Sequence, residues 1–92
     1  MNRLSEEKVV RVLLVDDHEM VRIGLAAVLG TEAGIEVVGE AGNGMDGLRM
    51  AREFKPDVVL MDLVMEGMDG IETTRRIMEE LPECRVIVLT SF

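Results

Sequence analysis

Hydrophobic and polar positions follow two kinds of pattern along this chain. Four short runs are rich in branched aliphatic residues, which is typical of strands buried in a parallel sheet. Three longer segments repeat their apolar residues every three or four positions, which is typical of helices with one buried face. The predicted strands span residues 9–15, 35–41, 57–62 and 85–90, and the predicted helices span residues 18–29, 45–54 and 70–81.

Turn-forming residues separate these segments. Gly30 stops the first predicted helix, and Pro56 and Pro82 end the other two. Strands and helices that alternate through short connections require parallel pairing and right-handed crossovers. We therefore predict an α/β fold, a doubly wound parallel sheet with helices on both faces. The chain forms a single domain over residues 9–92, preceded by a flexible polar leader at residues 1–8.

Three aspartates stand at the ends of predicted strands. Asp16 and Asp17 follow the first strand, and Asp62 closes the third. The carboxyl ends of parallel strands meet at one edge of the sheet, so these carboxylates converge if the two strands are neighbours. Clustered carboxylates are costly, and a hard divalent cation removes that cost. The sequence thus predicts a magnesium site that leaves Asp62 free to attack a phosphoryl group.

Composition limits the remaining possibilities. Eighteen acidic residues against ten basic ones give a net charge of −8, which argues against direct binding of nucleic acid. The aromatic fraction of 2% excludes a platform for stacking bases. A single cysteine, Cys84, indicates a reducing compartment. Because no run approaches 18 apolar residues and the first eight residues are polar, we expect a soluble cytoplasmic protein without a membrane segment.

Several motifs, in this order and at consistent spacing, resemble the receiver domain of two-component response regulators. They lie at residues 12–18, 62–65, 68–70 and 89–91. Residues 16–25, 38–41 and 43–44 are similar to the NarL/LuxR branch, and residues 62–66 and 68–72 are similar to cell-envelope-stress regulators of Gram-positive bacteria. The resemblance covers nearly the whole chain and implies a flavodoxin-like sheet with strand order 2-1-3-4.

The resemblance also implies a role for individual residues. Asp16 and Asp17 match the acids that hold Mg²⁺, together with Asp62 and the backbone carbonyl of the residue at Val64. Asp62 matches the phosphoacceptor, which receives its phosphoryl group from a phosphohistidine on a sensor histidine kinase. Thr90 matches the hydroxyl that moves toward that group and switches the domain. Such a protein is a signalling module, not an enzyme, and its native output is regulation of transcription.

The chain departs from the family pattern in two places. Glu66 stands where the family often has proline. A complete receiver also continues beyond the fourth strand with a helix, a fifth strand that carries a lysine, and a last helix, so we expect these elements to be absent here. Neither Lys8 nor Lys55 is placed to substitute for that lysine. The fourth strand is then an apolar edge, and we expect a homodimer or oligomer to form through it.

Other interpretations of the same residues remain open. The chain can be a structural fragment that keeps the fold and oligomerises through its fourth strand without switching. A phosphatase of the haloacid-dehalogenase kind also uses a strand-terminal aspartate, but it normally has a second acid at the position of Val64. Asp17 can instead cap the first helix. His18 more simply marks the start of that helix than a phosphodonor or a metal ligand.

Overall fold

The computed structural model of the chain describes residues 8–65 and 70–89. Within them, four parallel strands form one sheet in the order β2-β1-β3-β4, which confirms the predicted strand order. The leader at residues 1–7, the loop at 66–69 with Glu66, and Thr90 lie outside the described residues. The elements are β1 (Val10–Val15), α1 (Glu19–Leu29), β2 (Ile35–Ala41), α2 (Gly44–Phe54), β3 (Val58–Asp62), α3 (Gly70–Glu80) and β4 (Arg85–Leu89).

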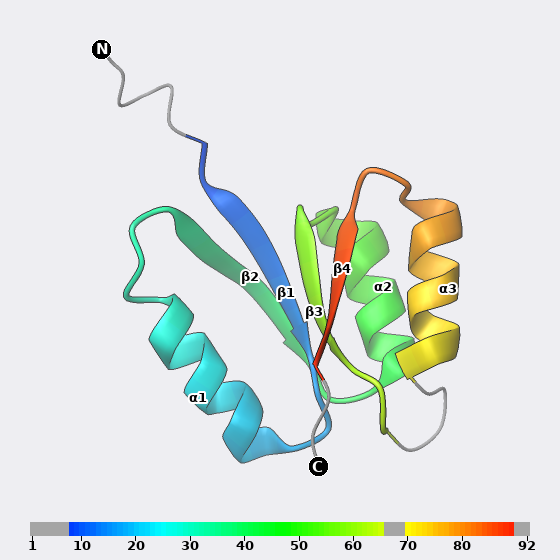
Figure 1. The fold of residues 1–92 in the computed structure, drawn as a ribbon, viewed down its shortest axis with the longest axis horizontal. Helices are drawn as coiled ribbons and strands as arrows, with labels where there is room; N and C mark the ends of the chain where they lie inside the picture. Colours follow the sequence, from blue (N-terminus) through cyan, green and yellow to red (C-terminus); the bar gives the residue numbers. More distant parts are fainter. Residues whose placement is uncertain (1–7, 66–69, 90–92) are drawn as a thin grey trace.

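The described helices cover both faces of the sheet, as predicted. Helix α1 lies alone on one face, where it contacts β1 and β2, whereas α2 and α3 pack side by side on the other face (Figure 1). None of these helices is long and apolar enough to cross a bilayer. The crossovers keep all four strands pointing the same way, so their carboxyl ends share one edge of the sheet.

The core lies between the sheet and the α2–α3 layer. Leu13, Val15, Met61 and Ile77 are fully buried there, as the aliphatic runs of β1 and β3 lead one to expect. Gly47 allows α2 to approach β1 closely, because a Cβ atom at this position would be 3.0 Å from both methyl groups of Val15. This contact holds α2 directly against the carboxyl end of β1.

Local signals in the sequence account for the ends of α2. Asn43 caps its first turn, since the side-chain oxygen accepts a hydrogen bond of 2.8 Å from the backbone N–H of Asp46. At the other end, Lys55 takes a left-handed conformation with φ 48° and precedes Pro56, which cannot continue a helix. The predicted boundaries of all the elements lie within one residue of those observed.

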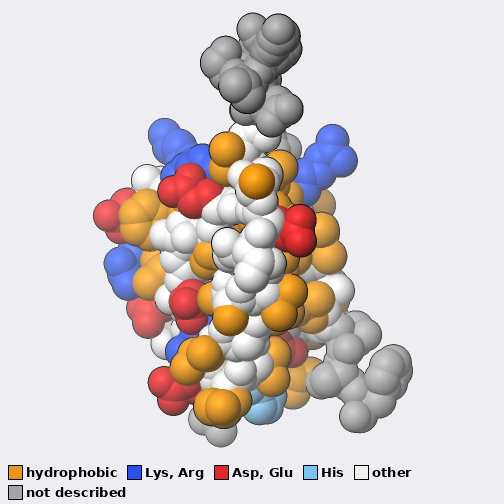
Figure 2. Space-filling view, turned by 90° about the vertical axis from the view of Figure 1, so that its left-hand side faces the viewer, with side chains coloured by type: hydrophobic (Ala, Val, Ile, Leu, Met, Phe, Trp, Pro, Cys, Tyr) orange, Lys and Arg blue, Asp and Glu red, His pale blue; other side chains and the backbone are white. Residues whose placement is uncertain are grey.

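Helix α1 forms where the sequence predicts it, but none of its apolar side chains is fully buried by the described residues; Leu25, Ala26 and Leu29 are half-buried. Met20 is 79% exposed and Val28 is 65% exposed. Figure 2, which views the molecule from the α1 side, shows hydrophobic side chains along this helix. At 100° per residue, the apolar positions extend around more than half of the helix, so the single contact with β1 and β2 cannot cover them all.

Candidate metal centre

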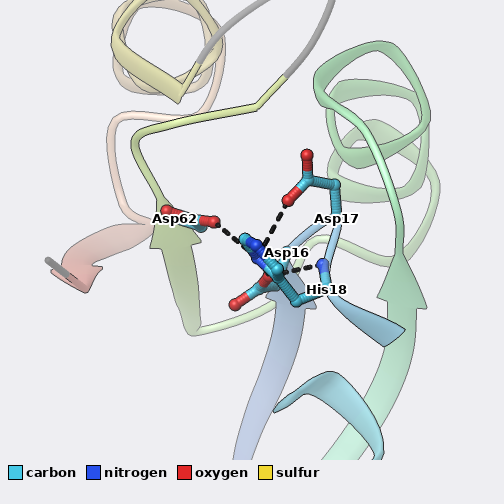
Figure 3. Close-up of side chains that lie close together, drawn as sticks. All are labelled: Asp16, Asp17, His18 and Asp62. Carbon is cyan, nitrogen blue, oxygen red and sulfur yellow. Dashed lines mark hydrogen bonds and ion pairs between the residues drawn. The ribbon is translucent and has the colours of Figure 1, made fainter. Parts of the chain in front are cut away.

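The predicted aspartates converge at the carboxyl edge of the sheet. Strands β1 and β3 are hydrogen-bonded neighbours with Val15 opposite Met61, so the residues that follow these two positions lie beside one another. Figure 3 shows Asp16, Asp17 and Asp62 facing a common space, together with His18. One ligand atom from each of these side chains lies within 4.8 Å of the others.

Asp16 and Asp62 are both nearly buried, with 5% and 6% of their surface exposed. Hydrogen bonds from the backbone offset part of the cost of burying these charges. Asp16 Oδ1 accepts a bond of 2.7 Å from the N–H of His18, and Asp62 Oδ1 accepts one of 3.1 Å from the N–H of Val64. The other oxygen of Asp62, Oδ2, faces His18 Nδ1 at 3.7 Å. Each carboxylate therefore has one oxygen fixed by the backbone.

His18 places its imidazole among the carboxylates. Its Nδ1 atom is 3.1 Å from Asp16 Oδ1 and 3.1 Å from Asp17 Oδ1. The hydrogen bond to Asp16, and then the negative charge of Asp17, raise the pKa of His18 above its ordinary value of 6.5. The ring thus lies directly beside the carboxylates, an arrangement that the interpretation of His18 as a helix start did not reveal.

The structure also decides how the first helix begins. His18 is the N-cap of α1, so the prediction that this residue marks the helix start is confirmed. Its side chain makes no capping hydrogen bond and turns toward the acids instead. The alternative in which Asp17 caps the helix is wrong, because the helix starts one residue too late for it. The position of a histidine directly after an acid pair was the sequence signal for this arrangement.

Arg22 supports the site from α1, a role that the sequence analysis missed. Its Nη1 donates a hydrogen bond of 2.7 Å to the backbone carbonyl of Asp16, and its Nε lies 3.3 Å from Glu40 Oε1 on β2. The Asp16 N–H in turn donates to the carbonyl of Ala41 at 3.0 Å. Asp16 is thereby held on both sides by groups from α1 and β2. The only sequence signal is an arginine in the first turn of the helix, five residues after Asp17.

The other predicted site residues are less fully placed. Val64 lies just after β3 and is 74% exposed, while the metal-binding role of its carbonyl stays a prediction. Thr90 lies outside the described residues. Lys55 lies at the opposite end of β3 from Asp62, where its carbonyl accepts a hydrogen bond from Arg11 Nη1, so it cannot reach the aspartates.

The donor set fits a hard divalent cation. Carboxylate oxygens are the ligands that Mg²⁺ and Mn²⁺ prefer, and Mg²⁺ is commonly held by only one or two of them, with water and phosphate completing its shell. Here two nearly buried carboxylates and one more exposed one share the same space, and a cation among them would offset their mutual repulsion.

Residues 12–92 match the model of the response regulator receiver domain family. The chain belongs to the response regulator receiver family. Receiver domains bind Mg²⁺ at an acidic pocket, interact with histidine kinases and act as signalling modules rather than as typical enzymes. The resemblance found in the sequence, including its NarL/LuxR character, is confirmed.

Individual relatives support this assignment. The transcriptional regulatory protein LiaR of Bacillus subtilis is 64% identical over 83 residues, which are 90% of this chain and 39% of LiaR. The response regulator protein VraR of Staphylococcus aureus is 54% identical over 83 residues, which are 90% of this chain and 40% of VraR. The crystal structure of a two-component response regulator of the LuxR family from an Aurantimonas species has a TM-score of 0.86 and 38% identity, covering 92% of this chain and 61% of that one. This receiver chain therefore spans about two fifths of the length of the curated relatives.

Proposed function

We propose that this chain is the phosphoaccepting receiver of a two-component response regulator and that Asp62 is the acceptor. The observation that carries the proposal is the convergence of Asp62 with Asp16 and Asp17 at the carboxyl edge of adjacent strands in a member of this family. The phosphoryl donor is a phosphohistidine on a sensor histidine kinase. Residues 9–92 form the receiver, and residues 1–8 form a leader.

In the proposed reaction, Asp62 Oδ2 forms a bond to phosphorus while the bond between phosphorus and the kinase imidazole breaks. The electron pair of the broken bond returns to the imidazole nitrogen. Asp62 Oδ1 accepts a hydrogen bond from the N–H of Val64, which supports Oδ2 as the attacking atom. The hydroxyl of Thr90 donates to a phosphoryl oxygen in the product and so transmits the change.

Asp16, Asp17, Asp62 and the backbone carbonyl of Val64 are the residues that would hold Mg²⁺. When bound, this ion would neutralise the negative charge that develops on the phosphoryl oxygens. The chain's own residues hold the carboxylates in position. Hydrogen bonds from Arg22 and to the backbone of β2 fix the backbone of Asp16, and the nucleophile Asp62 is fixed as the last residue of β3.

The output of the whole protein is proposed to be regulation of transcription in the cytoplasm. LiaR is a transcriptional regulatory protein and VraR is a response regulator, and this chain corresponds to only part of each. With a net charge of −8, the receiver itself is not the DNA-binding part. DNA binding is assigned to a part of the whole protein outside this segment.

Intact mass spectrometry tests the proposal. The chain is incubated with Mg²⁺ and a small phosphodonor such as phosphoramidate, in parallel with Asp62→Asn and Asp57→Asn. Asp57 is the matched control because it lies immediately before β3, at the opposite end of the strand from Asp62. We expect one added phosphoryl group on the wild type and on Asp57→Asn, and none on Asp62→Asn.

The result that overturns the proposal is equally specific. A wild-type chain that is folded by circular dichroism but gains no phosphoryl group favours the alternative of a structural fragment that keeps the fold without accepting phosphate. Modification that persists in Asp62→Asn would place the acceptor elsewhere.

A further inference from the structure

The imidazole Nδ1 atom of His18 lies within hydrogen-bonding distance of the carboxylates of Asp16 and Asp17. We propose that His18 Nδ1 is a fourth protein ligand of the cation site, so that the site binds borderline divalent ions such as Co²⁺, Ni²⁺ and Zn²⁺ more tightly than Mg²⁺. This inference rests on the proposed function only in using the same three aspartates. It adds a nitrogen ligand and a metal preference that the acceptor role does not require.

The distances around Nδ1 match those between neighbouring ligands of one ion. Ions of this size hold nitrogen and oxygen ligands at about 2.0–2.2 Å, which puts adjacent ligand atoms roughly 3.0–3.5 Å apart. Nδ1 lies 3.1 Å from Asp16 Oδ1, 3.1 Å from Asp17 Oδ1 and 3.7 Å from Asp62 Oδ2. A single ion can therefore contact the nitrogen and the carboxylates with only small side-chain movements.

The backbone around His18 holds the ring in place for this role. As N-cap of α1, His18 has an extended conformation, with φ −94° and ψ 102°. Its backbone N–H donates a hydrogen bond to Asp16 Oδ1, the same oxygen that the ring atom Nδ1 approaches. The His18 side chain is 63% exposed, so the ring can adjust by the few tenths of an ångström that metal coordination needs without disturbing the core.

Ligand chemistry gives the direction of the preference. Imidazole nitrogen suits Zn²⁺, Ni²⁺ and Co²⁺, whereas Mg²⁺ favours oxygen and gains little from it. For sites with nitrogen and oxygen ligands, affinity also rises from Mn²⁺ through Co²⁺ and Ni²⁺ toward Cu²⁺. A receiver with three carboxylates alone would have weaker selectivity for these ions than one with a histidine in the same cluster.

Two substitutions separate the nitrogen from the rest of the site. His18→Ala removes the ligand. His18→Asn retains a good N-cap residue and offers an amide oxygen in its place. Calorimetric titration of the tag-free chain with CoCl₂ and with MgCl₂ gives affinities for both ions. We expect Co²⁺ affinity to fall on the order of tenfold or more in both variants, while Mg²⁺ affinity stays within about twofold.

A spectroscopic measurement identifies the ligating atom. His18 is the only histidine in the sequence, so the imidazole ¹⁵N signals of the labelled chain report on it alone. We expect Zn²⁺ to shift Nδ1 as the bound nitrogen and to leave Nε2 carrying the proton. The same titration on Cys84→Ser removes binding to the one thiol, Cys84, as an explanation.

Three results would overturn the inference: Co²⁺ affinity unchanged in His18→Ala, equal losses for Co²⁺ and Mg²⁺, or Zn²⁺ bound through Nε2. Failure of the proposed function is distinguishable from these. If Asp62 does not accept a phosphoryl group but Zn²⁺ still binds Nδ1, the acceptor role is wrong and the metal ligand stands.

Discussion

Gly70, the first residue of α3, lies directly against the backbone carbonyl of Asp62. A Cβ atom added at Gly70 would overlap this oxygen and come within 2.5 Å of the Cα of Leu63. The Gly70 N–H also donates a hydrogen bond of 3.1 Å to the Leu63 carbonyl. The absence of a side chain at the start of α3 thus sets how the backbone leaves the acceptor residue.

Gly70→Ala is therefore expected to displace the segment that follows Asp62. The clash is with backbone atoms that cannot rotate away, so we expect a loss of about 1–3 kcal/mol in the free energy of unfolding, measured by urea denaturation. The rate of phosphoryl acceptance should fall as well. Gly24→Ala is the control, since nothing lies within 4 Å of a Cβ there. This helical substitution should be neutral or stabilise by about 0.5–1 kcal/mol. Equal effects of the two variants would contradict the prediction.

Arg22→Ala is expected to loosen Asp16. The Arg22 side chain is 18% exposed and its guanidinium donates to the Asp16 carbonyl at 2.7 Å, so its removal leaves that carbonyl without this partner. We expect a loss of about 1–2 kcal/mol in unfolding free energy and weaker Mg²⁺ affinity, by urea denaturation and calorimetry. Arg49→Ala is the control, because Arg49 is 60% exposed and its ion pairs should contribute about 0–1 kcal/mol. Unchanged Mg²⁺ affinity in Arg22→Ala would argue against a positioning role.

The sequence predicted the strands and helices that carry this site better than the arrangement of the side chains within it. Strand runs that end at Asp16 and Asp62, with helices between them, were enough to derive parallel pairing, because burial and topology act on whole segments. The strand order that makes β1 and β3 neighbours, and so brings the acids together, was implied by the family resemblance. The inward turn of His18 and the reach of Arg22 depend on side-chain rotamers and on the distance between β1 and β2. No periodicity in the sequence carries that information.

The same limit applies to α1. Its apolar spacing predicted a helix correctly, and it also predicted a buried face, which the described part of the chain covers only in part. Periodicity reports which residues favour burial, whereas the neighbouring elements decide which are buried. Met20 and Val28 are exposed for this reason.

Glu72 on α3 should titrate far below an ordinary glutamate. Hydrogen bonds from Arg75 and then Arg76 lower its pKa from 4.5 to about 2. Because the pKa is lowered in the folded state, the stabilisation is complete above pH 4.5 and is lost as the pH falls through about 2. Carboxyl ¹³C NMR should show this midpoint in the wild type. Arg75→Gln should move it back toward 4.5, and Arg85→Gln, outside this network, should leave it unchanged. A wild-type midpoint near 4.5 would rule out these ion pairs in solution.

The fourth strand is the basis of a prediction about self-association of this 92-residue chain. Among the described strands, β4 pairs only with β3, and it exposes neighbouring apolar residues on its two faces, Ile87 at 51% and Val88 at 41%. An apolar strand with an open edge favours pairing with another copy. We expect dimers or larger species by light scattering at high micromolar concentration. Ile87→Lys should raise the monomer fraction, because a charged residue on an edge strand opposes pairing. Met78→Lys, which changes a similarly exposed residue on α3, should not. A monodisperse wild-type monomer would show that the edge is insufficient to drive association.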